Sequence, residues 1–293
     1  MRHGISTHIF LQQRLTPALL DTLAGAGAGA IEVFAARHHF DYTNRDSVRE
    51  LAGWFGSHPV AALLHMPLFD DEVPWTRHSA PTLNLISSNK STRIDTMDEV
   101  KRALEAAEQI PFTSCAIHLG LKDDPWETRA LDDSLTAIEH LKAFAGPLGV
   151  KLLLENLTND VATPEHLVEI VQVGHFANVG FAFDVGHAHL GQSLPETSHA
   201  PARSALELAF AAFASVADRI AVVDLHDNHG VRDEHLWPLE TAEAGSIDWA
   251  ALKQPFEKLP VETVTLLEIA HELGDEPKQV AEKSAATWTQ LQL

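Results

Sequence analysis

Residues 150–187 read VKLLLENLTNDVATPEHLVEIVQVGHFANVGFAFDVGH, and the order of apolar patterns within them predicts how the chain folds. Two short apolar runs, Val150–Glu155 and Val179–Asp184, have the length and composition of buried β-strands. Between them, Pro164–Val173 carries apolar residues at helical spacing, and a Thr-Pro pair stands at its start, as in many helices. A strand, a helix and a second strand in this order predict parallel strands joined by a right-handed crossover.

The same alternation runs along the whole chain. Strands are expected at His3–Ser6, Ala30–Phe34, Val60–His65, Ser114–His118, Val150–Glu155, Val179–Asp184, Ile220–His226 and Val264–Ile269. Helices are expected at Thr16–Leu23, Ser47–Phe55, Thr96–Gln109, Leu131–Phe144, Pro164–Val173, Ala202–Val216, Asp248–Leu259 and Pro277–Leu291. This pattern favours an α/β fold closed into a (β/α)₈ barrel, with an open doubly wound sheet as the second choice. Because no linker divides the chain, residues 1–293 are predicted to form a single TIM-barrel domain.

The charge balance disfavours one class of partner. The chain carries 21 Lys and Arg against 41 Asp and Glu, a formal net charge of -20, which repels a phosphate backbone. Extended binding of nucleic acid is therefore not expected. The single cysteine, Cys115, allows no intrachain disulfide, and neither a signal-like start nor a membrane-length apolar run is visible. These features predict a cytoplasmic protein with no membrane partner.

Polar side chains follow six successive predicted strands, at the point where each strand ends. They are His65, His118, Glu155, Asp184, His226 and Glu268. Since parallel strands of a barrel place their carboxyl ends on one rim, we expect these side chains to share one pocket. A hydrogen-bonded structural role explains any one histidine equally well. Buried carboxylates without partners cost several kcal/mol each, however, and a shared cation would stabilise them together. The sequence thus predicts a divalent-metal site.

Two short motifs extend this cluster. FDVGH places Asp184 three residues before His187, with Gly186 allowing a sharp turn just beyond the strand. RDEHLWP places Asp233 two residues before His235, in the long connection after the seventh predicted strand. An aspartate that only caps a helix is the alternative for the first motif.

Taken together, these residues resemble the xylose-isomerase-like barrel superfamily, the group shared by sugar phosphate isomerases/epimerases and apurinic/apyrimidinic endonuclease family 2. The resemblance covers nearly the whole chain. It depends on eight short motifs in one order: HMP at His65, IHLG at His118, LLENL at Glu155, FDVGH at Asp184, LHDNHG at His226, DEHLWP at Asp233, GSIDW at Gly245 and LLEI at Glu268.

In the isomerase and epimerase branch, the resemblance implies one divalent ion held by Glu155, Asp184, His226 and Glu268. Imidazole with carboxylates suits zinc, manganese or cobalt. Glu155 and Glu268 would also flank the substrate carbon, one taking a proton and the other returning it, while the metal polarises the carbonyl of a sugar or sugar phosphate. His187 would orient a hydroxyl of the substrate.

In the endonuclease branch, the same resemblance implies three zinc ions and phosphodiester hydrolysis. The first ion would be held by His65, His118 and Glu155. The second would be held by the four-residue set of the isomerase branch, and the third by His187, Asp233 and His235. One to three ions per chain are therefore expected. The acidic charge keeps the isomerase hypothesis first.

Four residues are candidate substrate contacts under the isomerase hypothesis: His65, His118, Arg37 and Trp237. A solvated loop is the alternative for Arg37, and ordinary packing is the alternative for Trp237. Val161 lies where a ketose epimerase of this resemblance carries a second glutamate, which argues against a ketose 3-epimerase. A non-catalytic barrel that only binds metal is the third hypothesis, because a fold alone does not guarantee chemistry. An oligomer is compatible with the sequence, which does not specify one.

Overall fold

Eight parallel strands close into a barrel in the computed structural model, which describes residues 1–70, 79–193, 202–239, 245–270 and 276–292. Each strand pairs with the next one along the chain, and β8 pairs with β1 in parallel register from Arg2 opposite Val264 to Ile5 opposite Leu267. The predicted barrel is therefore confirmed, and the open doubly wound sheet is excluded.

The strands coincide closely with the predicted runs. They are β1 (Arg2–Ser6), β2 (Ala30–Phe34), β3 (Ala61–His65), β4 (Phe112–Ile117), β5 (Lys151–Glu155), β6 (Gly180–Asp184), β7 (Ile220–Leu225) and β8 (Val264–Leu267). The α-helices are α1 (Pro17–Gly25), α2 (Arg45–Ser57), α3 (Lys90–Glu105), α4 (Thr128–Ala145), α5 (Pro164–Val173), α6 (Val185–His189), α7 (Ala205–Phe213), α8 (Lys253–Phe256) and α9 (Pro277–Leu291). A short 3₁₀ helix, η1 (Thr7–Phe10), follows β1 directly.

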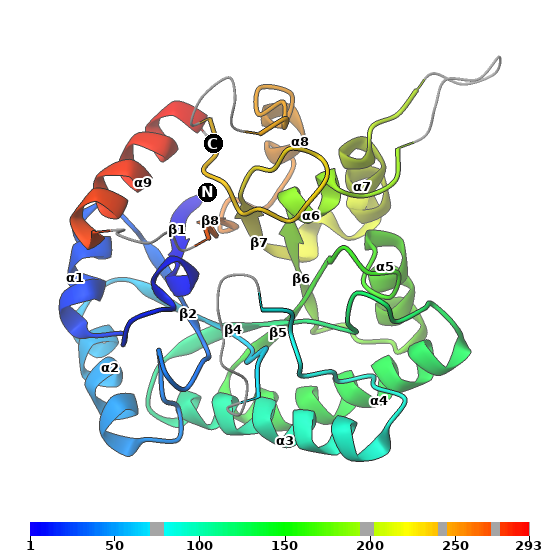
Figure 1. Ribbon diagram of the computed structural model, residues 1–293, viewed down its shortest axis with the longest axis horizontal. Helices are drawn as coiled ribbons and strands as arrows, with labels where there is room; N and C mark the ends of the chain where they lie inside the picture. The colour runs from blue at the N-terminus through cyan, green and yellow to red at the C-terminus, as the bar shows by residue number, and fades with distance from the viewer. Residues whose placement is uncertain (71–78, 194–201, 240–244, 271–275, 293) are drawn as a thin grey trace.

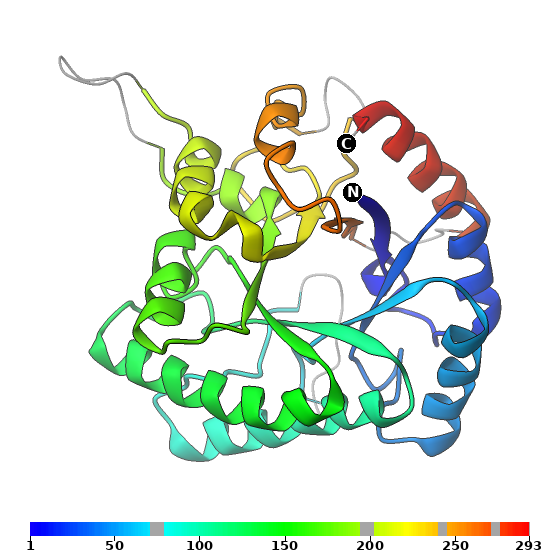
Figure 2. The same cartoon turned by 180° about the vertical axis from the view of Figure 1, so that it is seen from behind.

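The longer helices form a ring around the strands, and α6 lies inside this ring beside β7 (Figure 1, Figure 2). Two predicted helix starts have the expected capping chemistry. The Thr16 hydroxyl accepts a hydrogen bond from the Leu19 amide at 3.4 Å, and the Thr163 hydroxyl accepts one from the His166 amide at 3.3 Å. These caps fix where α1 and α5 begin.

Side chains inside the barrel change from apolar to polar along the strands. A layer of small and aliphatic residues packs together at the amino-terminal half: Ala30, Leu63, Leu153, Ala182, Val222, Val264 and Leu266. Because alternate residues of a strand face the same side, the residue two positions further on also points inward. Those positions hold Glu32, His65, Glu155, Asp184, Asp224 and Glu268, all of them buried. The strand pleat thus collects polar groups at the carboxyl-terminal mouth.

Three helical elements differ from expectation. The helix predicted at Thr96–Gln109 is α3, which begins at Lys90, where Asn89 caps it, and ends at Glu105. The helix predicted at Asp248–Leu259 is wrong in length, since only α8 is helical there. Pro255 has no amide hydrogen to donate to Ala251, and the indole of Trp249 is held by the Asp227 carboxylate at 2.8 Å. Helix α6 was not predicted, because five residues are too few to show a helical period.

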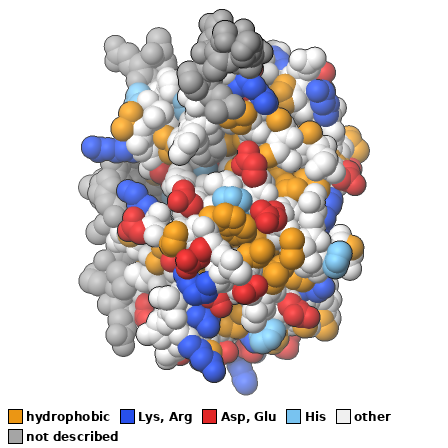
Figure 3. Space-filling view, turned by 90° about the vertical axis from the view of Figure 1, so that its right-hand side faces the viewer, with side chains coloured by type: hydrophobic (Ala, Val, Ile, Leu, Met, Phe, Trp, Pro, Cys, Tyr) orange, Lys and Arg blue, Asp and Glu red, His pale blue; other side chains and the backbone are white. Residues whose placement is uncertain are grey.

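Across the described part of the chain, no helix is both long enough and apolar enough to cross a lipid bilayer. On the side of the molecule shown in Figure 3, acidic and basic side chains are interspersed over the described surface, with hydrophobic side chains between them. That face therefore has the mixed charge typical of a solvated protein surface.

Candidate metal centre

The first group of potential ligands lies at the ends of β3, β4 and β5. His65 and His118 bring their Nε2 atoms to 3.0 Å of each other, and the Nε2 of His118 lies 3.0 Å from Oε2 of Glu155. His65 lies 3.6 Å from the same oxygen. Three donor atoms that converge in this way can surround one cation.

A second group joins the end of β5 to β6 and β7. The Nε2 of His226 lies 3.0 Å from both carboxylate oxygens of Asp184. Glu155, Asp184 and His187 form one cluster of potential ligand atoms. Glu268 instead falls in a cluster with His8 and His235. Of the predicted four-residue set, Glu155 and Glu268 line the cavity at the barrel mouth, and no cluster at ligand spacing among the described residues contains all four members.

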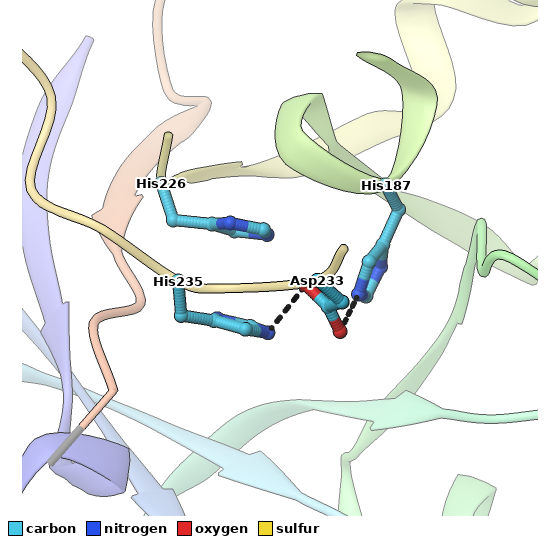
Figure 4. Close-up of side chains that lie close together, drawn as sticks. All are labelled: His187, His226, Asp233 and His235. Atoms are coloured by element: carbon cyan, nitrogen blue, oxygen red, sulfur yellow. Dashed lines mark hydrogen bonds and ion pairs between the residues drawn. The ribbon is translucent and has the colours of Figure 1, made fainter. Parts of the chain in front are cut away.

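The third group combines His187, His226, Asp233 and His235, whose side chains converge in Figure 4. Asp233 lies between two imidazoles, at 3.1 Å from Nε2 of His187 and 3.2 Å from Nε2 of His235. The rings of His226 and His235 stack with centroids 3.8 Å apart. His235 has a backbone φ of 48°, a strained conformation for a residue other than glycine.

Three of these histidines are held through the same ring nitrogen, Nδ1, by a backbone carbonyl. The Nδ1 of His65 contacts the Met66 carbonyl at 2.8 Å, that of His187 the Asn156 carbonyl at 3.0 Å, and that of His235 the Glu268 carbonyl at 2.9 Å. A carbonyl oxygen can only accept, so each Nδ1 must donate its proton. The Nε2 atom is then the one left for a metal, which is the usual arrangement of metal-binding histidines.

Nearby carboxylates make the same histidines strongly basic. Burial lowers the pKa of His65, but the carboxylates of Glu155 and Glu32 outweigh it and raise this pKa to about 9. Burial likewise opposes the attraction of Asp233 at His235, whose pKa rises to about 10. The pKa of His187 also lies well above its ordinary value, because Asp184 and Asp233 outweigh burial.

The pKa values of the two central glutamates, Glu155 and Glu268, are shifted in opposite directions. Burial raises the pKa of Glu155, but His118 and His65 outweigh it and hold this pKa well below the ordinary value. Burial raises the pKa of Glu268 to about 7, with the charge of Glu155 adding to the rise and that of His235 opposing it. Within one cavity, Glu155 is therefore the carboxylate that stays ionised, and Glu268 is the carboxyl group that more readily keeps its proton.

These residues fit a divalent cation. Glu268 Oε2 and His226 Nδ1 are buried and have no hydrogen-bond partner among the described residues. Orphaned polar atoms of this kind are costly, and a cation in the cluster would satisfy the carboxylate oxygen directly. The donor set of imidazole nitrogens and carboxylate oxygens suits a transition metal.

The cluster opens into a cavity of about 870 Å³ at the carboxyl-terminal mouth of the barrel. Trp237, predicted as a substrate contact, lines this cavity, as do His65 and His118. The cavity is also lined by Phe34, whose ring stacks on His65 with centroids 4.2 Å apart.

Arg37 is not brought to this cavity. Its guanidinium binds the Glu99 carboxylate of α3 through contacts of 2.5, 2.7 and 2.9 Å, and the Tyr42 hydroxyl donates to the same carboxylate. The predicted substrate contact of Arg37 is therefore replaced by a structural one. The physical reason is that the largely buried carboxylate of Glu99 requires cationic partners.

Sequence reasoning missed three ionisable residues around the site. His8, on η1, lines the cavity, and its Nδ1 donates to the Ile269 carbonyl at 3.1 Å. Burial and the neighbouring His235 lower the pKa of His8 to about 3, so this ring is neutral. Beneath the cluster, burial raises the pKa of Glu32 to about 8, and burial with the surrounding carboxylates raises that of Asp224 as well. Counting alternate residues back from the strand ends would have found Glu32 and Asp224.

Two known proteins illustrate what this chain is similar to in sequence. An uncharacterised protein of Methanocaldococcus jannaschii is 27% identical over 243 residues, covering 80% of this chain and 74% of that protein. A probable endonuclease 4 of Haloquadratum walsbyi is 25% identical over 126 residues, covering 43% of this chain and 37% of that protein.

Solved structures share the fold over the full chain. A D-tagatose 3-epimerase-like protein superposes with a TM-score of 0.73 at 22% identity, covering 100% of this chain and 97% of that one. The IOLI protein with a bound zinc atom superposes with a TM-score of 0.74 at 18% identity, with coverages of 100% and 96%. The family model for the xylose isomerase-like TIM barrel matches residues 20–291, and the chain therefore belongs to the xylose isomerase-like TIM barrel family.

Proposed function

We propose that the protein is a divalent-metal-dependent isomerase or epimerase of a sugar or sugar phosphate, which works by proton transfer through an enediolate. The observation that carries this proposal is the pair Glu155 and Glu268. Both are buried, both line the same cavity from the ends of β5 and β8, and both lie beside metal-capable side chains. Proton transfer at a carbon next to a carbonyl needs a base within reach of that carbon, and two carboxyl groups in one enclosed site can take the proton and return it.

The residues around the cavity would have separate roles in this reaction. Glu155 and Glu268 would exchange a proton with the substrate carbon from their two positions in the cavity. His187, held at Nδ1 by the Asn156 carbonyl, would direct Nε2 to a hydroxyl of the substrate. Trp237 would provide an apolar wall for the sugar ring or chain. A bound Zn²⁺, Mn²⁺ or Co²⁺ would polarise the carbonyl and stabilise the negative charge that develops on it.

Relatives in structure support a sugar as the substrate class, since they include proteins named D-tagatose 3-epimerase-like and L-ribulose 3-epimerase. The position of Val161 argues against transfer of that 3-epimerase activity. Val161 is fully buried in the β5–α5 connection, where its amide donates to Asn159 at 2.9 Å, and it offers no carboxylate. We therefore propose an isomerase, or an epimerase acting at another carbon.

Exchange of substrate hydrogen with deuterated solvent tests this proposal. Glu155→Gln and Glu268→Gln should each reduce deuterium incorporation into a turned-over sugar by at least about 100-fold, the scale of general acid–base catalysis. Glu234→Gln is the matched control, because Glu234 lines the same cavity but binds His229 at 2.8 Å. Metal content must be measured for each variant. Unchanged exchange in both cluster variants would contradict the proposal.

A phosphodiesterase with three zinc ions is the second candidate. The observation that favours it is the presence of two further ligand groups, His65–His118–Glu155 and His187–Asp233–His235, beside the central one. Elemental analysis separates the candidates. Three tightly held zinc ions per chain with cleavage of abasic-site DNA would establish the phosphodiesterase, whereas one exchangeable Zn²⁺, Mn²⁺ or Co²⁺ favours the isomerase.

A further inference from the structure

The turn from β6 into α6 carries two of the proposed ligands, Asp184 and His187, within four residues. The backbone of this turn packs against the ring of a third proposed ligand, His226. A methyl group placed on Gly186 would lie 2.0 Å from Cε1 and 2.4 Å from Nδ1 of the His226 ring. The Asp184 carboxylate also accepts a hydrogen bond from the His187 amide at 2.6 Å. The position of this backbone therefore determines where both ligands point.

Asn156, the residue after Glu155, holds one side of the turn. Its Nδ2 donates to the Asp184 carbonyl at 2.8 Å, and its Oδ1 accepts from the Asp184 amide at 2.9 Å. Its own carbonyl accepts from Nδ1 of His187 at 3.0 Å. One residue, only 1% exposed, thus fixes the backbone of one proposed ligand and the ring of another.

Asn228, two residues after His226, holds the other side. Its Nδ2 donates to the Gly186 carbonyl at 2.9 Å, and its Oδ1 accepts from the Gly230 amide at 2.8 Å. The side chain is fully buried. The same turn is therefore hydrogen-bonded by Asn156, which follows β5, and by Asn228, which follows β7.

We infer that Asn156 and Asn228 form an asparagine clamp that positions Asp184 for metal binding and fixes the direction of the His187 Nε2 atom, whether that atom binds a cation or a substrate hydroxyl. This inference rests on the proposed metal centre but not on sugar chemistry. An amide is suited to the task because it donates and accepts at once and carries no charge. Aspartate at position 156 would keep the acceptor but place a second oxygen against the Asp184 carbonyl, which would push the turn away.

The test compares two Asn→Asp substitutions in the loop that follows β5. In each of them the side-chain amide nitrogen is replaced by an oxygen. Asn156→Asp should weaken Zn²⁺ binding by about 10–100-fold, the usual effect of losing a residue that orients metal ligands, and should alter the visible spectrum of the Co²⁺-loaded protein. Asn159→Asp is the matched control. Asn159 is also buried and makes three hydrogen bonds, to backbone groups of Leu119, Val161 and Ala162, none of them a proposed ligand.

Both variants should lower the urea midpoint of the metal-free protein, but only Asn156→Asp should change Zn²⁺ affinity and the Co²⁺ spectrum. Asn228→Asp, measured in the same way, should reproduce the loss of affinity if Asn156→Asp does not fold. Wild-type affinity and spectrum in a folded clamp variant, or an equal loss in Asn159→Asp, would overturn the inference. Failure to find any sugar that exchanges hydrogen would refute the isomerase proposal and leave this result intact.

Discussion

Three histidine rings of the site are oriented before any metal arrives. His65, His187 and His235 each donate Nδ1–H to a backbone carbonyl, and this bond persists whether Nε2 carries a proton or a metal. Orienting the rings in advance reduces the side-chain entropy that metal binding must overcome. The carbonyl acceptors belong to Met66, Asn156 and Glu268, so the strand ends themselves hold the rings in place.

Metal binding at these rings should release protons. In the metal-free protein the pKa of His65 is about 9 and that of His235 about 10, so both Nε2 atoms are protonated at pH 7. A metal can take Nε2 only after this proton leaves, and its affinity should therefore rise with pH up to about 9–10. Calorimetric Zn²⁺ titrations at pH 7.5, in buffers of different ionisation enthalpy, should report more than one proton released per chain. Heats that do not depend on the buffer would contradict this expectation.

The same pKa values give the sign of a stability change in the metal-free protein. Both histidines are raised above 6.5 on folding, so their contribution to the free energy of unfolding is fully present below about pH 6.5. It is lost as the pH rises through 9 to 10. Metal removal should therefore make the protein more sensitive to alkali than to mild acid.

Most site residues were predictable because a polar side chain at the end of an apolar strand stands out in the sequence. His8 does not, since it lies two residues beyond β1, on η1. Arg37 was placed wrongly, because its partner Glu99 is 62 residues away on α3 and no local pattern connects them. Asn156 was visible in the LLENL motif, but its role depends on β6 lying beside β5, which only the closed barrel reveals.

At the scale of elements, the turn between β6 and α6 leaves no room for a side chain at Gly186. Gly186→Ala should force its new methyl group into the His226 ring, 2.0 Å away. We expect a loss of about 1–3 kcal/mol in unfolding free energy and a Zn²⁺ affinity at least about 10-fold weaker. The measurements are urea unfolding of the metal-free protein and competitive Zn²⁺ titration.

The control for this substitution is Gly53→Ala in the middle of α2, where the added methyl group meets no atom within 4 Å apart from its chain neighbours and the backbone of its own helix. Alanine should there stabilise the helix by about 0.5–1 kcal/mol and leave Zn²⁺ affinity unchanged. If Gly186→Ala bound Zn²⁺ as tightly as Gly53→Ala does, the turn would not determine ligand position.

The regular elements followed from sequence because each repeats a local period, while α6 and α8 did not. α6 depends on a cap in which the Asp184 carboxylate accepts from the His187 amide, and the same aspartate belongs to a cluster of potential metal ligands. Around α8, the buried Asp227 carboxylate accepts from the amides of Ser246 and Ile247 as well as from the Trp249 indole. A local capping bond determines α6 and tertiary hydrogen bonds determine the segment around α8, and neither kind of bond leaves a periodic signal in the sequence.

At the scale of the whole molecule, the apolar layer that stabilises the barrel and the polar cluster of the candidate site lie in different halves of it. The aliphatic layer at the amino-terminal half contributes buried apolar area, and the carboxyl-terminal half gathers five buried carboxyl groups: Glu32, Glu155, Asp184, Asp224 and Glu268. Burial and the neighbouring carboxylates raise the pKa values of Glu32, Asp224 and Glu268, so these three keep their protons more readily, while Glu155 stays negatively charged. Protonated histidines offset part of this charge in the metal-free protein, and a divalent cation would offset more.

Chelation should therefore destabilise the whole barrel. Zn²⁺ at a free concentration 100 times its Kd stabilises the folded state by about 2.7 kcal/mol, which corresponds to a rise of roughly 4–5 °C in Tm for a chain of this size. Calorimetric scans with Zn²⁺ and with excess EDTA measure this difference directly. Asp184→Asn, which removes a buried carboxylate from the cluster, should lose most of the Zn²⁺-dependent rise, whereas Asp248→Asn, outside the cluster, should keep it. Equal Tm values for the wild-type protein in Zn²⁺ and in EDTA would show that no cation binds at this mouth, because a ligand specific to the folded state must raise its stability.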